Sequence, residues 1–226
     1  MEEITGFNDL TLQEGIYFLN YKTEQEAFWA SDFGNEYIQR KQGEDEKRKK
    51  IFLWSILMSN LPKVDSIFEF GCNIGLNLKA INYLQPEIVL RGIDINKLAV
   101  RQASKSNIGH IKEGSITEPL KLPKTDLVFT FGVLIHVNPD KLEAAYSNLF
   151  ETSKKYILVA EYFNPTPIEV DYRGHRGKLF KRDFSGDLMD LYDLNLVNYG
   201  FFYKNDKKTA QDNLNWFLLE KKIPRA

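Results

Sequence analysis

The sequence predicts an α/β protein with one mostly parallel sheet, helices on both faces and an antiparallel hairpin at its C-terminal end. Short apolar runs alternate with helix-like segments between residues 66 and 161, which is typical of a parallel sheet covered by helices. A glycine-bearing turn follows the first of these runs. Two later strand-like runs, at residues 196–203 and 214–221, are joined without a helix, and strands joined in this way pair antiparallel.

The composition is that of an ordinary globular chain. Its 226 residues, 43% hydrophobic and 27% charged, fit one large domain with an extension. A formal net charge of -1 argues against the broad basic face that nucleic-acid binding needs. We find no signal peptide and no long apolar span, so we expect a cytoplasmic protein without a membrane partner. The single cysteine, Cys72, excludes an internal disulfide and a cysteine-rich metal cluster, and we predict no metal site.

The first part of the chain is predicted to be helical. We expect residues 1–60 to form an extension to a domain that spans residues 61–226. Thr23 followed three places later by Glu26 is a capping box, which predicts the start of a helix. Residues 31–40 are aromatic and polar without a clean period, so they fit either a lid over a cofactor or an extension packed on the sheet.

Residues 44–58 are predicted to form one helix with a charged half and an apolar half. Acids at positions 44 to 46 precede bases at 48 to 50 by four residues, a spacing that favours ion pairs on one helix face. We therefore interpret the basic run 47–50 as a solvated helix face and not as a phosphate site. Residues 51–58 are apolar nearly all round and are expected to be buried.

The strand predicted at residues 66–70 leads into a turn that resembles a cofactor site. Glycines at 71 and 75 allow a tight turn, and we expect backbone N–H groups at the N-terminus of the next helix to stay open to a ligand. The dinucleotide fingerprint requires glycines at its first, third and sixth positions, which are occupied here by Gly71, Asn73 and Leu76. The acid-x-Gly-x-Gly-x-Gly pattern of S-adenosylmethionine (SAM) methyltransferases is met from Glu69 to Gly75 with one substitution, Asn73, and asparagine tolerates a left-handed backbone.

Two residues near this turn leave alternatives open. Cys72 is either a nucleophile or a small side chain that fills a tight loop, and the sequence favours the second interpretation. Asp94 follows the next predicted strand, 88–93, where a carboxylate can accept two hydrogen bonds from a ribose diol. Alternatively, Asp94 or Asn96 caps the helix predicted over residues 97–103.

The remaining elements complete the sheet. Further strands are predicted at residues 108–112, 126–131 and 156–161, and further helices at residues 139–153 and 183–192. Ligands of such sheets lie beyond the carboxyl ends of the strands. Residues 162–179 are too polar and too rich in proline and glycine to be core, and a loop of this length is usually functional or disordered.

Together these stretches resemble the class I SAM-dependent methyltransferases, which have a Rossmann-like sheet. More narrowly, four segments are similar to the methyltransferases associated with pseudaminic acid biosynthesis: residues 28–37, 70–78, 132–139 and 172–175. The likeness extends over about residues 20 to 221. It implies SAM as cofactor, and a sugar or nucleotide-linked sugar of surface polysaccharide or nonulosonic acid biosynthesis as substrate.

The class resemblance also implies a set of cofactor-binding residues. They are Phe70, Gly71, Cys72, Asn73, Gly75, Asp94, Ile95, Ser115, Ile116 and Phe131. The glycine turn would lie along the methionine part of SAM and Asp94 would hold the ribose. Ile95 and Ile116 would flank the adenine, and Phe131 would meet the amino acid end through its backbone. Ser115 stands where the class often has an acid that accepts from the adenine amino group.

Catalysis of methyl transfer to oxygen or to an ammonium nitrogen requires a base. His136 follows a predicted strand and should open toward the crevice, although a capping or packing role is the alternative. His175 lies between Arg173 and Arg176 in the irregular loop, and positive charge there disfavours a protonated imidazole. These arginines, with Tyr172, suit a carboxylate or phosphate on the substrate; the alternative is a solvated loop of ordinary charge.

The sequence thus predicts a SAM-dependent methyltransferase that acts on a small polar acceptor. Two other classes stay open. One is an NAD(P)-binding oxidoreductase with a Rossmann-type sheet, against which Leu76 and the predicted hairpin weigh. The other is a non-catalytic protein that binds SAM, because this chemistry requires no fixed catalytic residue.

Overall fold

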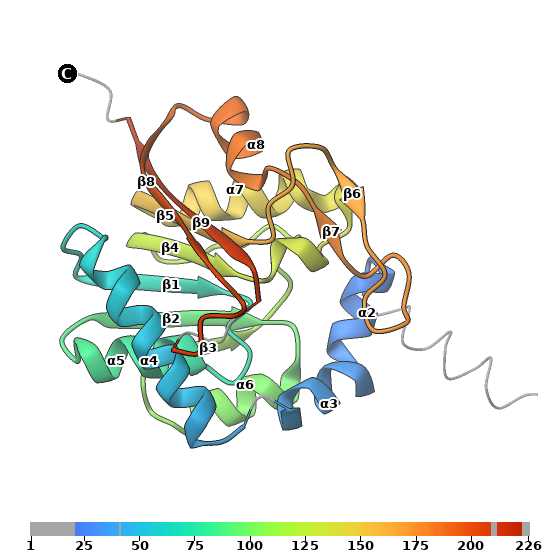
Figure 1. Cartoon of the computed structure of the whole chain (residues 1–226), viewed down its shortest axis with the longest axis horizontal. Helices are drawn as coiled ribbons and strands as arrows, with labels where there is room; N and C mark the ends of the chain where they lie inside the picture. The colour runs from blue at the N-terminus through green and yellow to red at the C-terminus, as the bar shows by residue number, and fades with distance from the viewer. Residues whose placement is uncertain (1–20, 41, 209–211, 223–226) are drawn as a thin grey trace, which may run out of the picture.

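The computed structural model describes residues 21–40, 42–208 and 212–222 (Figure 1). The predicted extension before residue 21 lies outside this part of the chain. The described α-helices are α2 (Glu24–Ala30), α3 (Asp32–Arg40), α4 (Glu44–Ser59), α5 (Leu76–Leu84), α6 (Lys97–Ser104), α7 (Leu142–Thr152) and α8 (Phe184–Leu191). Two short 3₁₀ turns, η1 (Leu134–His136) and η2 (Pro139–Lys141), precede α7. None of these helices is long and apolar enough to cross a membrane.

One seven-stranded sheet carries the fold, in the order β3-β2-β1-β4-β5-β9-β8. Its strands are β1 (Ser66–Phe70), β2 (Val89–Asp94), β3 (His110–Glu113), β4 (Thr125–Phe131), β5 (Ser153–Glu161), β8 (Leu194–Phe202) and β9 (Leu214–Lys221). The first five are parallel to one another, whereas β9 runs antiparallel to both β5 and β8. The predicted mostly parallel sheet with a C-terminal antiparallel hairpin is therefore confirmed.

Alternation along the central strands places one hydrophobic cluster on each face of the sheet. On one face Trp54 of α4 meets Phe129 of β4, with 4.9 Å between their ring centroids, and α5 packs beside them. On the other face Val128, the preceding residue, packs in a second cluster with α7 and α8. All five residues of β1 are buried, as expected for a strand covered on both sides.

Helix α4 differs from the expectation in its apolar half. Two of its ion pairs join residues three apart, Glu44 to Lys47 and Glu46 to Lys49; the expected pairing of residues four apart stays a prediction. Its apolar half is buried on one side only, and Phe52 is 38% exposed. Because α4 lies on the sheet surface with α5 beside it, only one face of the helix turns away from solvent.

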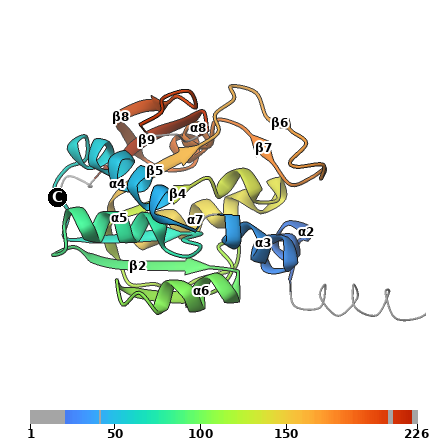
Figure 2. The same cartoon turned by 60° about the horizontal axis from the view of Figure 1, so that its bottom comes forward.

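The irregular segment after β5 is partly ordered into a small second sheet. Strands β6 (Ile168–Glu169) and β7 (Phe180–Lys181) pair antiparallel, and Tyr172 and His175 form a bridge between them along the chain. Figures 1 and 2 show this hairpin and the helices α2 and α3 beyond the carboxyl ends of the parallel strands. Both segments therefore lie where ligands of such sheets are found.

Candidate functional site

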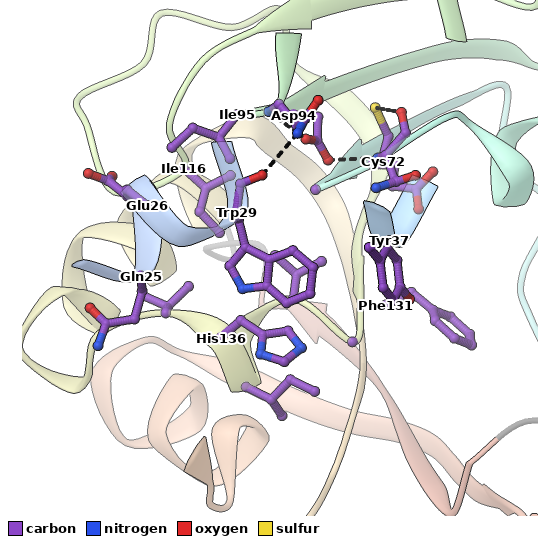
Figure 3. Close-up of a pocket in the computed structure, with 18 of the residues that line it drawn as sticks. Gln25, Glu26, Trp29, Tyr37, Cys72, Asp94, Ile95, Ile116, Phe131 and His136 are labelled. Atoms are coloured by element: carbon purple, nitrogen blue, oxygen red, sulfur yellow. Dashed lines mark hydrogen bonds between the residues drawn. The ribbon is translucent and has the colours of Figure 1, made fainter. Parts of the chain in front are cut away.

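A cavity opens at the carboxyl ends of β1, β2, β3 and β4, beneath α2 and α3 (Figure 3). Predicted site residues that line it are Gly71, Cys72, Asn73, Asp94, Ile95, Ser115, Ile116, Phe131, His136, Tyr172 and Arg173. Those that do not line it are Phe70, Gly75, His175 and Arg176. Phe70 is buried in the core, and Gly75 packs against Ala103 and Ile108 at the start of α5.

Asp94 joins the glycine turn to the end of β2. Its Oδ2 accepts a hydrogen bond from the backbone N of Asn73 at 2.7 Å, and its Oδ1 accepts from the backbone N of Asn96 at 2.8 Å. Asn96, not Asp94, caps α6, by accepting from the backbone N of Ala99 at 2.9 Å. Burial raises the pKa of the Asp94 carboxyl to about 6. A carboxylate has about four acceptor positions, so these two bonds leave capacity for ligand hydroxyls.

The glycine turn itself does not offer open N–H groups; the expectation for the first N–H groups of α5 stays a prediction. Every backbone N–H from residue 71 to residue 75 donates within the protein, to Ile93 O, Asp94 Oδ2, Asn73 Oδ1 or Cys72 O. The left-handed conformation predicted for Asn73 is present, with φ 47°, between glycines with φ of 72° and 73°. Gly71, Asn73 and Gly75 bend the turn toward the end of β2. The backbone N–H groups of the turn therefore form hydrogen bonds within the protein.

A second buried acid, Glu69, lies beside the turn. Its Oε1 accepts from Asn77 Nδ2 at 2.6 Å, whereas its Oε2 has no hydrogen-bond partner within the described residues. Burial raises the pKa of this carboxyl to about 8, against the opposing effects of Asn77 and Lys50. Since Glu69 also lines the cavity, its unpartnered oxygen fits a cationic group such as an ammonium.

The neighbouring Cys72 thiol is buried, and burial raises its pKa well above the usual range. It is therefore protonated at neutral pH and is no nucleophile in this state. Gly132, at the end of β4, provides open space. Apart from its two chain neighbours, no heavy atom of the described residues lies within 4 Å of the position where its Cβ would be, and its φ is 65°.

His136 projects from η1 into the cavity with a defined tautomer. Its Nδ1 lies 2.6 Å from the carbonyl oxygen of Lys178. Since a carbonyl can only accept, Nδ1 carries the proton and Nε2 carries the lone pair. Burial lowers the pKa of His136 to about 4, so the ring is neutral at pH 7. Trp29 and Tyr172 pack on it, with ring centroids 4.5 Å and 4.9 Å away.

Glu161, at the end of β5, holds the turn that carries His136. Its carboxylate accepts from the backbone N of Val133 at 3.0 Å and from the backbone N of Leu134 at 3.1 Å. Burial raises the pKa of Glu161 to about 7, and these backbone hydrogen bonds oppose that rise. The carboxylate thus fixes η1 from behind and is not itself a lining residue.

The helices α2 and α3 cover the cavity, and we call this segment the lid; that it opens and closes stays a prediction. Glu26 and Trp29 of α2 and Tyr37 of α3 line it. Asn96 Nδ2 donates to the backbone O of Trp29 at 3.0 Å, which ties α2 to the start of α6. Sequence reasoning missed these residues individually, although the aromatic density of residues 28–37 marked the segment.

Further polar side chains at the cavity come from distant parts of the chain. Tyr162 Oη donates to Asp212 Oδ2 at 2.5 Å, which joins the end of β5 to the segment before β9. Lys50 Nζ lies 3.7 Å from the centroid of the Phe131 ring, so it belongs to the cavity and not to a solvated face. The interpretation of the whole basic run as solvated is thus wrong at Lys50.

Two predicted residues of the hairpin lie away from the cavity. His175 is exposed and packs against Phe28, with 5.0 Å between ring centroids. Arg176 is exposed too, and its Nε lies 3.7 Å from Asp171 Oδ1. Tyr172 and His175 form a bridge across a tight turn, and both rings lie near Phe33, with ring centroids 6.0 Å and 5.4 Å away. The structure brings Tyr172 and Arg173 to the cavity, and not His175 or Arg176.

Comparisons with known proteins show which solved structures share this fold. No family model matches the sequence, and no curated protein matches it. Among solved structures, magnesium protoporphyrin IX methyltransferase from Synechocystis PCC 6803 with bound S-adenosylhomocysteine (SAH) has a TM-score of 0.64 at 14% identity, over 89% of this chain and 100% of that one. The same enzyme with SAM has a TM-score of 0.62 at 13% identity, over 88% and 98%.

Two other structures agree with this placement. The putative methyltransferase in complex with the Haloferax volcanii Trm112 activator has a TM-score of 0.67 at 11% identity, over 87% of this chain and 99% of that one. The O-methyltransferase of a polyketide multienzyme from Brevibacillus brevis, with SAH, has a TM-score of 0.60 at 14% identity, over 89% and 80%. The chain has the fold of class I SAM-dependent methyltransferases.

Proposed function

We propose that this protein is a SAM-dependent methyltransferase that acts on a small polar acceptor. The observation that carries the proposal is the carboxylate of Asp94, which lines the cavity and binds the backbone N of Asn73 at 2.7 Å. The acid after β2 and the glycine turn after β1 thereby meet in one place. Solved structures with this fold contain SAM or SAH.

The residues around the cavity fit the parts of SAM. Asp94 would accept from the ribose hydroxyls, Ile95 and Ile116 would cover the two faces of the adenine, and Glu69 would receive the α-ammonium. Glu69 suits this role because its buried Oε2 lacks a partner among the described residues. When bound, SAM supplies an electrophilic methyl group on a positively charged sulfur.

His136 is the proposed base. Its Nδ1–H is held by the carbonyl of Lys178, so Nε2 is free to take a proton from a hydroxyl or an ammonium group of the acceptor. The low pKa keeps the imidazole unprotonated across the physiological range, and the packing of Trp29 limits the access of water to this wall. Since His175 does not line the cavity, we assign it no step.

The acceptor is proposed to enter between the lid and the hairpin. Tyr37, Tyr162 and Tyr172 present phenol groups there, Asp212 adds a carboxylate, and Arg173 adds a cation. Such a set suits a molecule with several hydroxyls and an anionic group. The resemblance to the pseudaminic acid-associated methyltransferases makes sugars and nucleotide-linked sugars the first acceptors to test.

An oxidoreductase that uses NAD(P) is disfavoured by the turn at Asn73 and by the antiparallel β9, and a binding protein without turnover stays open to test. Methyl transfer should be measured with radiolabelled SAM against a panel of sugars and nucleotide-linked sugars. We expect label in at least one sugar acceptor, and none when His136→Ala replaces the wild type. Binding of SAH without transfer to any sugar, nucleotide or other hydroxylated acceptor would contradict the enzymatic proposal.

A further inference from the structure

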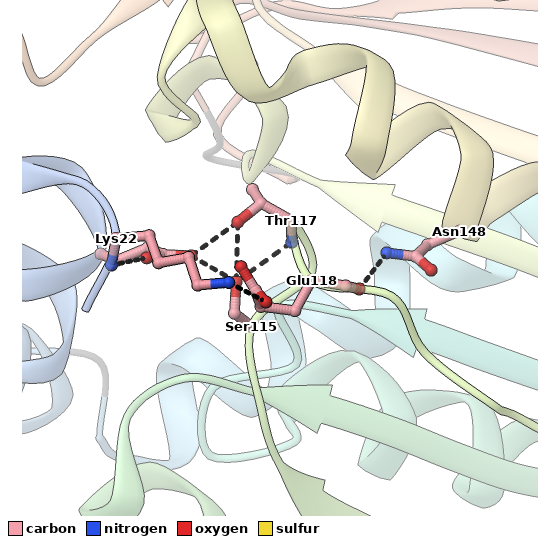
Figure 4. Close-up of polar contacts among 6 residues, drawn as sticks. Lys22, Ser115, Thr117, Glu118 and Asn148 are labelled. Carbon is pink, nitrogen blue, oxygen red and sulfur yellow. Dashed lines mark hydrogen bonds and ion pairs between the residues drawn. The ribbon is translucent and has the colours of Figure 1, made fainter. Parts of the chain in front are cut away.

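The lid carries a carboxylate, Glu26, that contacts the loop after β3. Figure 4 shows Ser115 and Thr117 of this loop, with Glu118 beside Lys22. Glu26, in the first turn of α2, accepts hydrogen bonds from the hydroxyls of Ser115 and Thr117, the second with Thr117 Oγ1 2.6 Å from Glu26 Oε1. Its other oxygen accepts from the backbone N of Lys22 at 2.8 Å. Glu26, Ser115 and Thr117 all line the cavity.

This cluster presents acceptors to the cavity. Both hydroxyl protons are directed at Glu26, and Ser115 Oγ also accepts from the backbone N of Thr117 at 3.0 Å. Burial would raise the pKa of Glu26, yet the hydrogen bonds from the two hydroxyls and the backbone outweigh it and lower the pKa. The group is therefore ionised at neutral pH, and a ligand atom placed here must donate a hydrogen bond.

The same end of the cavity has the shape for a flat ring. Figure 3 shows Glu26 close to Ile95 and Ile116, on the side away from Cys72 and Phe131. Two branched apolar side chains with a carboxylate at the edge suit a heteroaromatic ring that carries an exocyclic amino group. Of the parts of SAM, the adenine alone has this chemistry.

We propose that Glu26 of the lid accepts the hydrogen bond of the adenine amino group, so that the cofactor's base bridges the lid and the sheet. This inference rests on the proposed function, since it requires SAM in this cavity. Ser115 is then a positioning residue, which holds the carboxylate instead of contacting the amino group itself. In the class that the sequence resembles, an acid often occupies the position of Ser115 in the loop after β3. In this protein we expect Glu26 of α2 to supply the carboxylate instead.

Binding of the adenine amino group by Glu26 would couple cofactor recognition to closure of the acceptor site. Trp29 lies one turn after Glu26 on the same helix and packs on His136, with 4.5 Å between ring centroids. A ligand that binds Glu26 therefore also holds Trp29 against the proposed base. SAH should protect α2 and α3 from hydrogen exchange, whereas an analogue that loses the contact to Glu26 should protect them less.

The test compares SAH with its deaminated analogue S-inosylhomocysteine, which carries an oxo group in place of the amino group, by calorimetry. We expect the wild type to bind SAH at least about tenfold more tightly than the analogue. The oxo group of the analogue is a hydrogen-bond acceptor and cannot donate to the Glu26 carboxylate. Glu26→Gln offers a donor to the oxo group, so the preference should fall below about threefold. Hydrogen exchange of α2 and α3 with each ligand provides the second readout.

Glu118→Gln is the matched control. Glu118 pairs with Lys22 at 2.6 Å in the same contact between lid and loop, but it does not line the cavity, so the preference for SAH should stay as in the wild type. Equal binding of both ligands by the wild type, or an unchanged preference in Glu26→Gln, would overturn the inference while leaving SAM as cofactor. If the wild type bound neither ligand, the proposed function itself would fail.

Discussion

The two halves of the cavity are built in different ways. The half that we propose for the cofactor, called the cofactor half, lies at the ends of β1 and β2, where Asp94 and the turn at Asn73 are 21 positions apart in sequence and bind each other directly. The half that we propose for the acceptor, called the acceptor half, is assembled from α2, α3, the β6–β7 hairpin and the segment before β9, and its contacts span much longer stretches, such as Gln25 to Gly177. A regular sheet therefore fixes the first half, whereas side-chain contacts between irregular segments hold the second.

The largest expected effect is on turnover, in the acceptor half. His136→Ala should lower kcat by about 10²- to 10⁴-fold, the usual contribution of a general base, and leave SAH affinity unchanged. His175→Ala is the matched control, since this exposed histidine does not line the cavity, and it should stay within about threefold of wild type. Steady-state kinetics with the sugar acceptor checks both. Full activity of both variants would show that neither histidine is the catalytic base.

The next effect concerns the cofactor half. Asp94→Ala should weaken SAH binding by about 1–3 kcal/mol, because ribose hydroxyls would lose a buried acceptor. Glu113→Ala is the control: Glu113 pairs in register with Asp94 on β3 but is exposed and does not line the cavity. Calorimetry should show a loss for the first variant only. An unchanged affinity in Asp94→Ala would remove this residue from the ribose role.

The pH dependence separates binding from catalysis. The Asp94 carboxyl has a pKa of about 6, raised by burial, and a protonated carboxyl has fewer acceptor positions for the ribose. SAH affinity should therefore fall as pH falls below 6, by up to about tenfold per pH unit. Calorimetry from pH 5 to pH 8 measures this slope, and Asp94→Asn should flatten it. A wild-type affinity that is constant over this range would contradict the role of an ionised Asp94.

Stability of the ligand-free protein should follow the opposite trend. Burial raises the pKa of Asp94 to about 6, of Glu161 to about 7 and of Glu69 to about 8. For a raised carboxyl pKa, the stabilising contribution is complete below the unfolded-state value and is lost as pH rises through the folded-state value. The Tm of the ligand-free protein, measured by thermal denaturation, should accordingly fall between pH 5 and pH 8, and a Tm that rises over this range would contradict these pKa shifts.

A smaller effect is expected at the hairpin. Arg173→Ala should raise the KM for an anionic acceptor by about tenfold, since one charge-assisted hydrogen bond is worth about 1.5–3 kcal/mol at most, and should not change SAH affinity. Arg176→Ala is the control because its side chain is exposed and paired with Asp171. Equal effects of the two substitutions would mean that the cavity position of Arg173 has no special role.

The smallest effect tests the turn itself. Asn73 has φ 47°, and its side chain accepts from the backbone N of Ile74 at 2.8 Å. Asn73→Ala and Asn73→Gly both lose that hydrogen bond, but only alanine meets the left-handed backbone cost of about 1–2 kcal/mol. Urea unfolding should therefore find the alanine variant less stable by about 1 kcal/mol. Equal stabilities would show that the turn relaxes.

The sequence predicted that the turn at Asn73 and Asp94 meet at one edge of the sheet, because these signals are local. Glu69, Gly71 and Asn73 lie within five positions, and the period of the flanking strands gives their direction. The sequence could not predict the acceptors of the turn's N–H groups, since nothing local indicates that Ile93 and Asp94 accept them. Satisfaction of buried donors is a tertiary property.

The acceptor half was predicted only in part. A functional role was one of two alternatives for the aromatic segment 31–40 and for the loop 162–179, but no pattern links Gln25 to Gly177, which are 152 positions apart. Similarly, spacing on a helix predicted Lys50 to be solvated, whereas packing of α4 beside the end of β4 brings it over Phe131. The surroundings of these side chains depend on long-range contacts, and the periodicity of the sequence carries no information about such contacts.

Calorimetric titration of the wild-type protein with SAH and with NAD tests the central claim most directly. The account predicts that SAH binds at one site and that NAD does not compete with it. Tight binding of NAD without binding of SAH would contradict it.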